Sequence, residues 1–367
     1  MNFYRRIAAF LFLTAISNIA NARSHDLLLG QERCETDASQ NASKDVSQCY
    51  ESNFNTLAAL PLSKRADAAH THWSDTYWPN YVGGIAYRWQ TKKTPWGLPH
   101  PDLLDLHTMS PDELKKLSPA EKFDIYRALK SGQSLDYTLT HTVLRSTDPK
   151  EKHWEGICHG WSPASINHPE PLPVSIDVAG VHLEFGSSDI KALLDYYYGV
   201  YAYDLREVEQ VGSHSRRVDA GDFHLILANQ LGKLHRGFVV DIDPTPEIWN
   251  QPVVAVDFQY SGQDWGRGKD GSREKVHVTA TLHYIKESAP TWQPNISDNI
   301  KFEKTHVYQY VIKLDHDGMI TGGEWISTPP DFIWTVKPMK FENIPGQPEG
   351  DFSALNDLYR PVMNSHL

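Results

Sequence analysis

The sequence lacks the patterns that define several common classes of protein. It contains no P-loop, HExxH or CxxC motif, so P-loop nucleotide binding and zinc-protease chemistry have no support. No run of Lys and Arg stands out, and the formal net charge of −11 disfavours partners such as nucleic acid or anionic membranes. No uncharged apolar stretch reaches the roughly 20 residues that a membrane-spanning helix needs. We expect no membrane span, no cofactor and no metal site.

Cysteine is also scarce, with three residues in the whole chain. Cys34 and Cys49 lie in a polar, turn-rich segment, where a disulfide would close a short loop. An odd cysteine count in an exported protein leaves one thiol without a partner. We therefore expect a Cys34–Cys49 disulfide and a free thiol at Cys158.

The first residues have the order of a secretory signal peptide. Arg5 and Arg6 precede an apolar run over residues 7–16, and the small-residue pattern Ala20-Asn21-Ala22 follows. The sequence predicts a signal peptide over residues 1–22 and an exported protein, periplasmic or secreted.

The remaining chain predicts an α+β protein. An extended lead-in over residues 23–60 precedes a catalytic domain over 61–367, which is helical to about 205 and strand-rich over about 206–345. Helix starts are marked by Ser-Pro pairs with a Glu two positions after the Pro, and the strands by short runs rich in Val, Ile and Tyr. The expected helix starts are Ser110, Ser118 and Ser187 or Ser188, and the expected strands include Lys275–Ile285, Val307–Leu314 and Met319–Ile326. Helices followed by antiparallel strands favour an α+β fold over alternating βαβ units.

Cys158 is the candidate nucleophile. Gly156 and Gly160 flank it and leave backbone room for a substrate to approach. The following residues indicate a helix, whose N-terminus would lower the pKa of the thiol. The helix begins either near Cys158 or at Ser162-Pro163, and the second start would put Cys158 just before it. The alternative is an inert cysteine that fills the core.

A thiol nucleophile needs a His, and that His needs an orienting carboxylate. The apolar runs at residues 223–228 and 237–243 are separated by a glycine-containing turn and predict an antiparallel hairpin. In this register His224 lies opposite Asp243, with Asp241 one diagonal step away on the same face. The spacing thus predicts a His–carboxylate pair, and the alternative is a solvated strand face.

Three further aromatic or imidazole side chains lie close to the thiol in the sequence. His159 diverges from Cys158 by about 100 degrees on a helix, which favours a structural or substrate-facing role. Trp154 and Trp161 are candidates for contacts to the substrate or to an oxyanion, and Trp154 has simple packing as its alternative. No Gln lies in the several residues upstream of Cys158 to supply the oxyanion donor of papain-type enzymes.

Several short runs across the chain carry a family resemblance. They are Cys158-His159-Gly160-Trp161, Glu247-Ile248-Trp249-Asn250-Gln251-Pro252, Tyr77-Trp78-Pro79, Leu117 to Asp124, Gly322-Gly323-Glu324-Trp325 and Asp331-Phe332-Ile333-Trp334. The sequence here resembles the transglutaminase elicitor family, thiol transglutaminases of oomycetes with bacterial relatives. The resemblance implies a papain-like or transglutaminase-like α+β core, with the nucleophile on a helix and His and Asp on an antiparallel sheet. It also favours Asp243 over Asp241 as the carboxylate.

The expected activity is protein-glutamine γ-glutamyltransfer. The Cys158 thiolate attacks a protein Gln side chain, and a Lys or another primary amine accepts the acyl group from the thioester. The expected partners are therefore protein substrates, one as glutamine donor and one as amine acceptor. Water as acceptor would instead give a glutamine deamidase or a cysteine peptidase with the same triad. A non-enzymatic surface-binding module built on the aromatic-rich strands is the remaining class.

Overall fold

The computed structural model describes the chain from Tyr50 to Val362 with several gaps. The described residues are 50–66, 72–202, 208–211, 218–264, 274–295, 299–344, 349 and 351–362. The predicted signal peptide and both cysteines of the predicted disulfide lie outside these residues. Within them, no helix is both long enough and apolar enough to cross a membrane.

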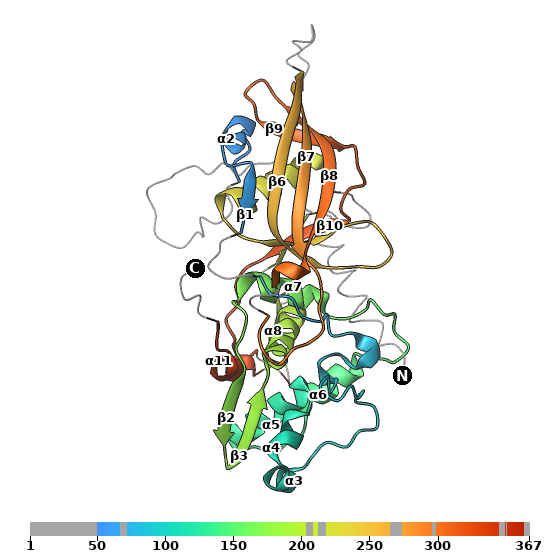
Figure 1. Cartoon of the computed structure of the whole chain (residues 1–367), viewed down its shortest axis with the longest axis vertical. Helices are drawn as coiled ribbons and strands as arrows, with labels where there is room; N and C mark the ends of the chain where they lie inside the picture. Colours follow the sequence, from blue (N-terminus) through green and yellow to red (C-terminus); the bar gives the residue numbers. More distant parts are fainter. Residues whose placement is uncertain are drawn as a thin grey trace, which may run out of the picture.

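Residues 72–202 form the helix-rich part of the molecule, called the helix half below (Figure 1). One β-hairpin, of strands β2 (Val174–Val178) and β3 (Val181–Phe185), interrupts the helices. The helices are α3 (Leu103–Thr108), α4 (Pro111–Lys115), α5 (Pro119–Ser131), α6 (Thr138–Arg145), α7 (Cys158–Asn167) and α8 (Ser187–Tyr201). A short C-terminal helix, α11 (Leu355–Leu358), packs against this half.

The predicted helix starts are confirmed by their capping. The Ser110 and Ser118 side chains accept hydrogen bonds from the backbone N–H groups of Glu113 and Glu121, and each Glu bonds back to its Ser. These reciprocal bonds satisfy N–H groups that a helix end otherwise leaves unpaired. Local sequence therefore fixes where α4 and α5 begin.

The strands from β4 onward make one antiparallel sheet, called the sheet half below. In spatial order they are β4 (Val208–Val211), β10 (Phe332–Val336), β5 (Phe238–Asp241), β6 (Gln251–Asp264), β7 (Glu274–Ile285), β8 (Glu303–Leu314) and β9 (Ile320–Trp325). A short strand, β1 (Ser63–Arg65), pairs with β6. The expected strands in the second part of the chain are confirmed, as is the mixed α+β architecture.

Two hydrophobic cores lie on either side of α7. One core fills the helix half around α8, and the other fills the space between the sheet, α2 (Phe54–Ala58) and α9 (Ala220–Leu227). Helix α7 packs against α8 on one side and against β5 and β6 on the other (Figure 1). Its first residue, Cys158, therefore lies at the boundary between the two halves.

Candidate active site

Cys158 is the first residue of α7 and its thiol is unpaired. The helix begins here because the backbone N–H groups of Gly160 and Trp161 donate to the carbonyl of Ile157, at 2.9 and 3.0 Å. The Ile157 N–H in turn donates to the carbonyl of Tyr77 at 2.8 Å. Only 4% of Cys158 is exposed. The thiol is thus held in the first turn of a buried helix.

The glycines beside the thiol serve packing rather than access. A Cβ atom on Gly156 would lie 2.5 Å from the carbonyl oxygen of Tyr77, and one on Gly160 would lie 1.8 Å from that of Asp195. Backbone atoms therefore fill the space that we expected to receive a substrate. Both positions exclude a side chain because other segments approach the helix so closely.

The side chain of Asn250 contacts the thiol directly. Its Nδ2 lies 3.5 Å from the sulfur of Cys158, and the sulfur lies 3.8 Å from the carbonyl oxygen of Ile248. The Oδ1 of Asn250 accepts a 2.9 Å hydrogen bond from the indole N–H of Trp334. Because an indole N–H can only donate, it holds the amide with its oxygen toward Trp334 and its NH₂ toward the sulfur.

Burial dominates the ionisation of the thiol. It raises the pKa of Cys158 to about 11, against the hydrogen bonds from Asn250, and the charges of Glu287 and Asp241 raise it further. The prediction that the helix N-terminus lowers this pKa is therefore wrong. Desolvation disfavours the thiolate more than the helix end favours it. At neutral pH the resting site holds a protonated thiol.

Two acids lie near this region, the buried Asp241 in the sheet and the half-buried Glu287 in the segment after β7. Asp241 ends β5, and burial together with the charges of Asp331 and Asp243 raises its pKa to about 8. One oxygen of its carboxylate, Oδ2, has no hydrogen-bond partner among the described residues. Glu287 accepts a 2.8 Å hydrogen bond from the side chain of Gln251, and burial raises its pKa as well.

An aromatic pair lies next to the thiol. Tyr77 and Trp249 meet edge to face, with ring centroids 5.1 Å apart and an interplanar angle of 80°. The Trp249 indole donates to Glu247 at 3.1 Å. Burial, with the charge of Cys158 among the smaller causes, raises the pKa of Tyr77 to about 12. The segment around Trp249 thus covers the thiol in the resting state.

The structure does not place His224 on a strand. It lies in helix α9, fully buried, and its Nδ1 is 2.9 Å from the hydroxyl oxygen of Tyr310. Its ring packs against Phe258 in the core of the sheet half, whereas Cys158 belongs to the core of the helix half. Among the described residues no hydrogen bond or ion pair joins His224 to Cys158, Asp241 or Asp243.

The predicted hairpin is therefore wrong. Strand β5 pairs with β6 and β10, so Asp243 does not lie opposite His224. Asp219 caps α9 by accepting from the backbone N–H groups of Gly221 and Asp222, and this cap begins a helix where we predicted a strand. A short apolar run buried on all sides looks the same in a helix and in a strand.

The other candidates from the sequence occupy different surroundings. Asp243 follows β5 half-buried and accepts a 3.0 Å hydrogen bond from the N–H of Thr245. Trp161 is fully buried and its indole donates to the carbonyl of Trp73 at 3.3 Å, so it packs in the core of the helix half. Trp154 is half-buried beneath the ammonium of Lys152, 5.4 Å from the ring centroid.

His159 is directed at α8 rather than at the thiol. It hydrogen-bonds to the backbone of Gly199, and burial lowers its pKa to about 4. A Cβ atom on Gly199 would lie 3.2 Å from its Nε2. The ring is thus neutral at physiological pH and fills the crossing of α7 and α8.

Sequence reasoning missed most of the residues that surround the thiol. Asn250, Tyr77 and Trp334 all lie in runs that carry the family resemblance, so that resemblance was a usable signal for them. Glu287 had no such signal, because it reaches the site from a connection after β7 that is far away in the sequence.

The arrangement of helices and antiparallel sheet is a transglutaminase-like fold, as the comparison with a solved structure shows. The crystal structure of the GP42 transglutaminase from Phytophthora sojae matches with a TM-score of 0.59 and 23% sequence identity, covering 87% of this chain and 98% of that chain. The likeness at this identity concerns the fold. No protein of curated function matches the sequence.

The family follows from the sequence itself. The profile named transglutaminase elicitor matches residues 150–342, more than half of the chain, and the chain belongs to this family. The matched region begins just before Cys158 and includes Asn250, Glu287 and Trp334.

Proposed function

We propose that this protein is a protein-glutamine γ-glutamyltransferase that works through a thioester on Cys158. The observation that carries the proposal is the contact between the thiol and the oriented amide of Asn250, at a helix start where the charges of Glu287 and Asp241 act on the thiol. Membership of the transglutaminase elicitor family supports the same reaction class.

In the first half-reaction the sulfur of Cys158 bonds to the γ-carbonyl carbon of a protein Gln. The C–N bond breaks, and ammonia leaves with the proton that the thiol gave up. In the second half-reaction a Lys amine attacks the thioester carbonyl and the C–S bond breaks. The proton released by the amine returns to the sulfur. Because the thiol is protonated at rest, each half-reaction needs a group that moves this proton.

We assign the proton relay to Asp241. With a pKa of about 8, Asp241 is mostly protonated at neutral pH, but its charged form is accessible and can accept and return a proton. The charge of that form also acts on the thiol. Asn250 is our candidate for the oxyanion donor, because its NH₂ group is already held toward the sulfur. The N–H of Cys158, at the first helical position, lacks an intrahelical acceptor and is a second candidate. This scheme does not use His224, because its ring packs in the core of the sheet half and contacts Tyr310. It also does not use Asp243, whose side chain accepts a hydrogen bond from Thr245.

The reaction is tested by incubating the protein with casein and a fluorescent primary amine while ammonia is measured. We expect amine incorporation with ammonia release, and loss of both to background in Cys158→Ala. Ammonia without incorporation would identify a glutamine deamidase, and new N-termini without either would identify a cysteine peptidase. Activity retained in Cys158→Ala would contradict any thiol-based enzyme. Absence of incorporation, ammonia and new N-termini in the wild type would leave the binding-module hypothesis.

We also propose that the protein is exported and carries the Cys34–Cys49 disulfide, on the sequence features of residues 1–49 alone. Peptide mapping of the exported protein without reduction should find these two cysteines bridged and Cys158 free. A bridge that includes Cys158 would contradict this and would indicate that the thiol must be reduced before it reacts.

A further inference from the structure

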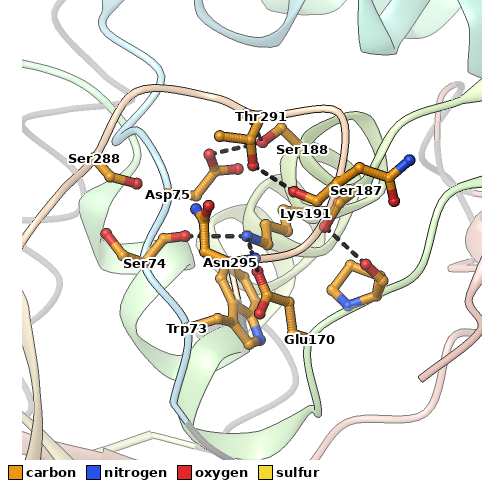
Figure 2. A network of polar contacts seen from close by, with 12 residues as sticks. Trp73, Ser74, Asp75, Glu170, Ser187, Ser188, Lys191, Ser288, Thr291 and Asn295 are labelled. Atoms are coloured by element: carbon orange, nitrogen blue, oxygen red, sulfur yellow. Dashed lines mark hydrogen bonds and ion pairs between the residues drawn. The ribbon is translucent and has the colours of Figure 1, made fainter. Parts of the chain in front are cut away.

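A buried polar network lies behind the candidate site, at the N-terminal end of α8 (Figure 2). Lys191 is fully buried, and its ammonium lies 2.6 Å from a carboxylate oxygen of Glu170 and 3.0 Å from the carbonyl oxygen of Ser74. Ser188 is also fully buried, and its hydroxyl donates to Asp75 at 2.9 Å. Helix α8 thus makes hydrogen bonds to Ser74 and Asp75, which precede Tyr77 in the chain.

The same network holds the segment after β7. The Ser188 hydroxyl accepts a 2.7 Å hydrogen bond from the N–H of Thr291, so one side chain links α8 to both segments. The Ser74 hydroxyl donates to the carbonyl of Lys286 at 2.6 Å, and the N–H of Ser288 donates to the carbonyl of Asp75 at 2.9 Å. Glu287 is therefore fixed on both sides by residues of the Ser74–Asp75 segment.

The segment that contains Tyr77 and the segment that contains Glu287 both lead to the surroundings of the thiol. The carbonyl of Tyr77 accepts a hydrogen bond from the N–H of Ile157, directly before Cys158. Glu287 accepts a 2.8 Å hydrogen bond from Gln251, the residue after the Asn250 that contacts the sulfur, and its charge raises the pKa of the thiol. A displacement of the network would therefore move a charge and a backbone contact next to the sulfur. Apolar packing alone would allow the two segments to slide, whereas directed hydrogen bonds to a buried charge fix their position.

We infer that Ser188, with Lys191 and Asp75, positions Tyr77 and Glu287 around Cys158, although none of the three contacts the sulfur. This inference deepens the proposed function and rests on it for its catalytic meaning. The positioning role itself concerns the reactivity of the thiol, which can be measured without the transfer reaction.

Helix α8 offers a matched control for Ser188. Ser187 is its neighbour, is equally buried and also loses one hydroxyl on replacement by Ala, but that hydroxyl donates to the carbonyl of Pro171 at 2.7 Å. Ser187→Ala therefore removes a buried hydrogen bond without releasing either segment. Ser74→Ala provides a second variant within the network, because it removes the hydroxyl that donates to the carbonyl of Lys286.

The experiment compares iodoacetamide labelling of Cys158 across pH in the full-length variants, together with their thermal unfolding. Loss of one or two buried hydrogen bonds corresponds to a change of about three- to tenfold in an equilibrium, so we expect labelling of Ser188→Ala to accelerate by that factor. The midpoint of its pH profile should move to lower pH, because the charge of Glu287 no longer acts fully on the thiol. Ser74→Ala should change in the same direction by less, and Ser187→Ala should follow the wild type.

Equal acceleration in Ser187→Ala and Ser188→Ala, in proportion to their loss of thermal stability, would overturn the inference and leave a purely stabilising network. An unchanged pH midpoint in both Ser188→Ala and Ser74→Ala would also overturn it. These results are independent of amine incorporation, so a failure of the proposed function, seen as activity in Cys158→Ala, is distinguishable from a failure of the positioning role.

Discussion

The two halves of the molecule bury polar groups in different ways. The helix half contains two fully buried lysines in ion pairs, Lys122 with Asp189 and Lys191 with Glu170, each at 2.6 Å. The core of the sheet half contains a neutral contact between His224 and Tyr310, where burial lowers the pKa of the His to about 3. Fully buried lysines in ion pairs therefore lie in the half that holds the thiol, whereas aromatic packing surrounds the buried histidine of the other half.

The candidate site draws on both halves because it lies at their boundary. The thiol comes from α7, while Asn250 and Asp241 come from the region where β5 and β6 meet that helix. A buried ion pair is not by itself a source of stability, but it can specify a single geometry. The comparison teaches that the buried histidine of the sheet half is part of a core, whereas the network of the helix half holds the segments next to the thiol and, as we propose, supports the chemistry.

The largest effect on stability is expected from Lys191→Met. Removing the ammonium leaves the Glu170 carboxylate buried without its cation, a loss of about 3–5 kcal/mol in the free energy of unfolding. Urea denaturation followed by fluorescence measures it. The double variant Lys191→Met/Glu170→Gln should recover part of the loss. A loss below about 1 kcal/mol in the single variant would contradict the view that this pair is buried and coupled.

The next largest effect is expected from a comparison of two buried asparagines, which tests the role of Asn250 in the candidate active site. Asn250→Ala should lower amine incorporation by about 100-fold, the scale of losing one oxyanion donor, because the amide that faces the sulfur is gone. The control is Asn229→Ala in the sheet half, whose side chain bonds to Glu51 and Leu225 and should cost stability rather than turnover. Equal losses of turnover in the two variants would contradict the assignment of Asn250.

The smallest effect is expected from His224→Phe. It should leave amine incorporation within about threefold of wild type, well below the effect of removing a general base. The free energy of unfolding should fall by about 1–2 kcal/mol, because the hydroxyl of Tyr310 loses its partner. Kinetics and urea denaturation of the same variant give both values. A 100-fold loss of turnover would mean that His224 reaches the thiol after a rearrangement, and the contrast between the halves would fail.

Local patterns predicted the elements well where the signal is local. The Ser-Pro-x-Glu pattern at Ser118 encodes its own helix start through a capping box, and the alternating run in Lys275–Ile285 encodes a strand with one buried face. At residues 223–228 every side chain is buried, so no periodicity separates helix from strand. In that segment the side chain of Asp219 caps a helix, so His224 does not lie on a strand opposite Asp243.

The sequence by itself determined the helix starts at Ser110 and Ser118 and an α+β chain of the transglutaminase elicitor family, because capping, alternation and motifs are properties of neighbouring residues. That α7 begins at Cys158 rather than at Ser162 was decided by the tertiary structure. The tertiary structure decided which groups meet the thiol and how it ionises. Asn250 and Glu287 reach it from positions about 90 and 130 residues further along the chain, through the packing of β6 and of the segment after β7 against α7. Burial then raises the pKa of the thiol, a consequence of surroundings that no local pattern encodes.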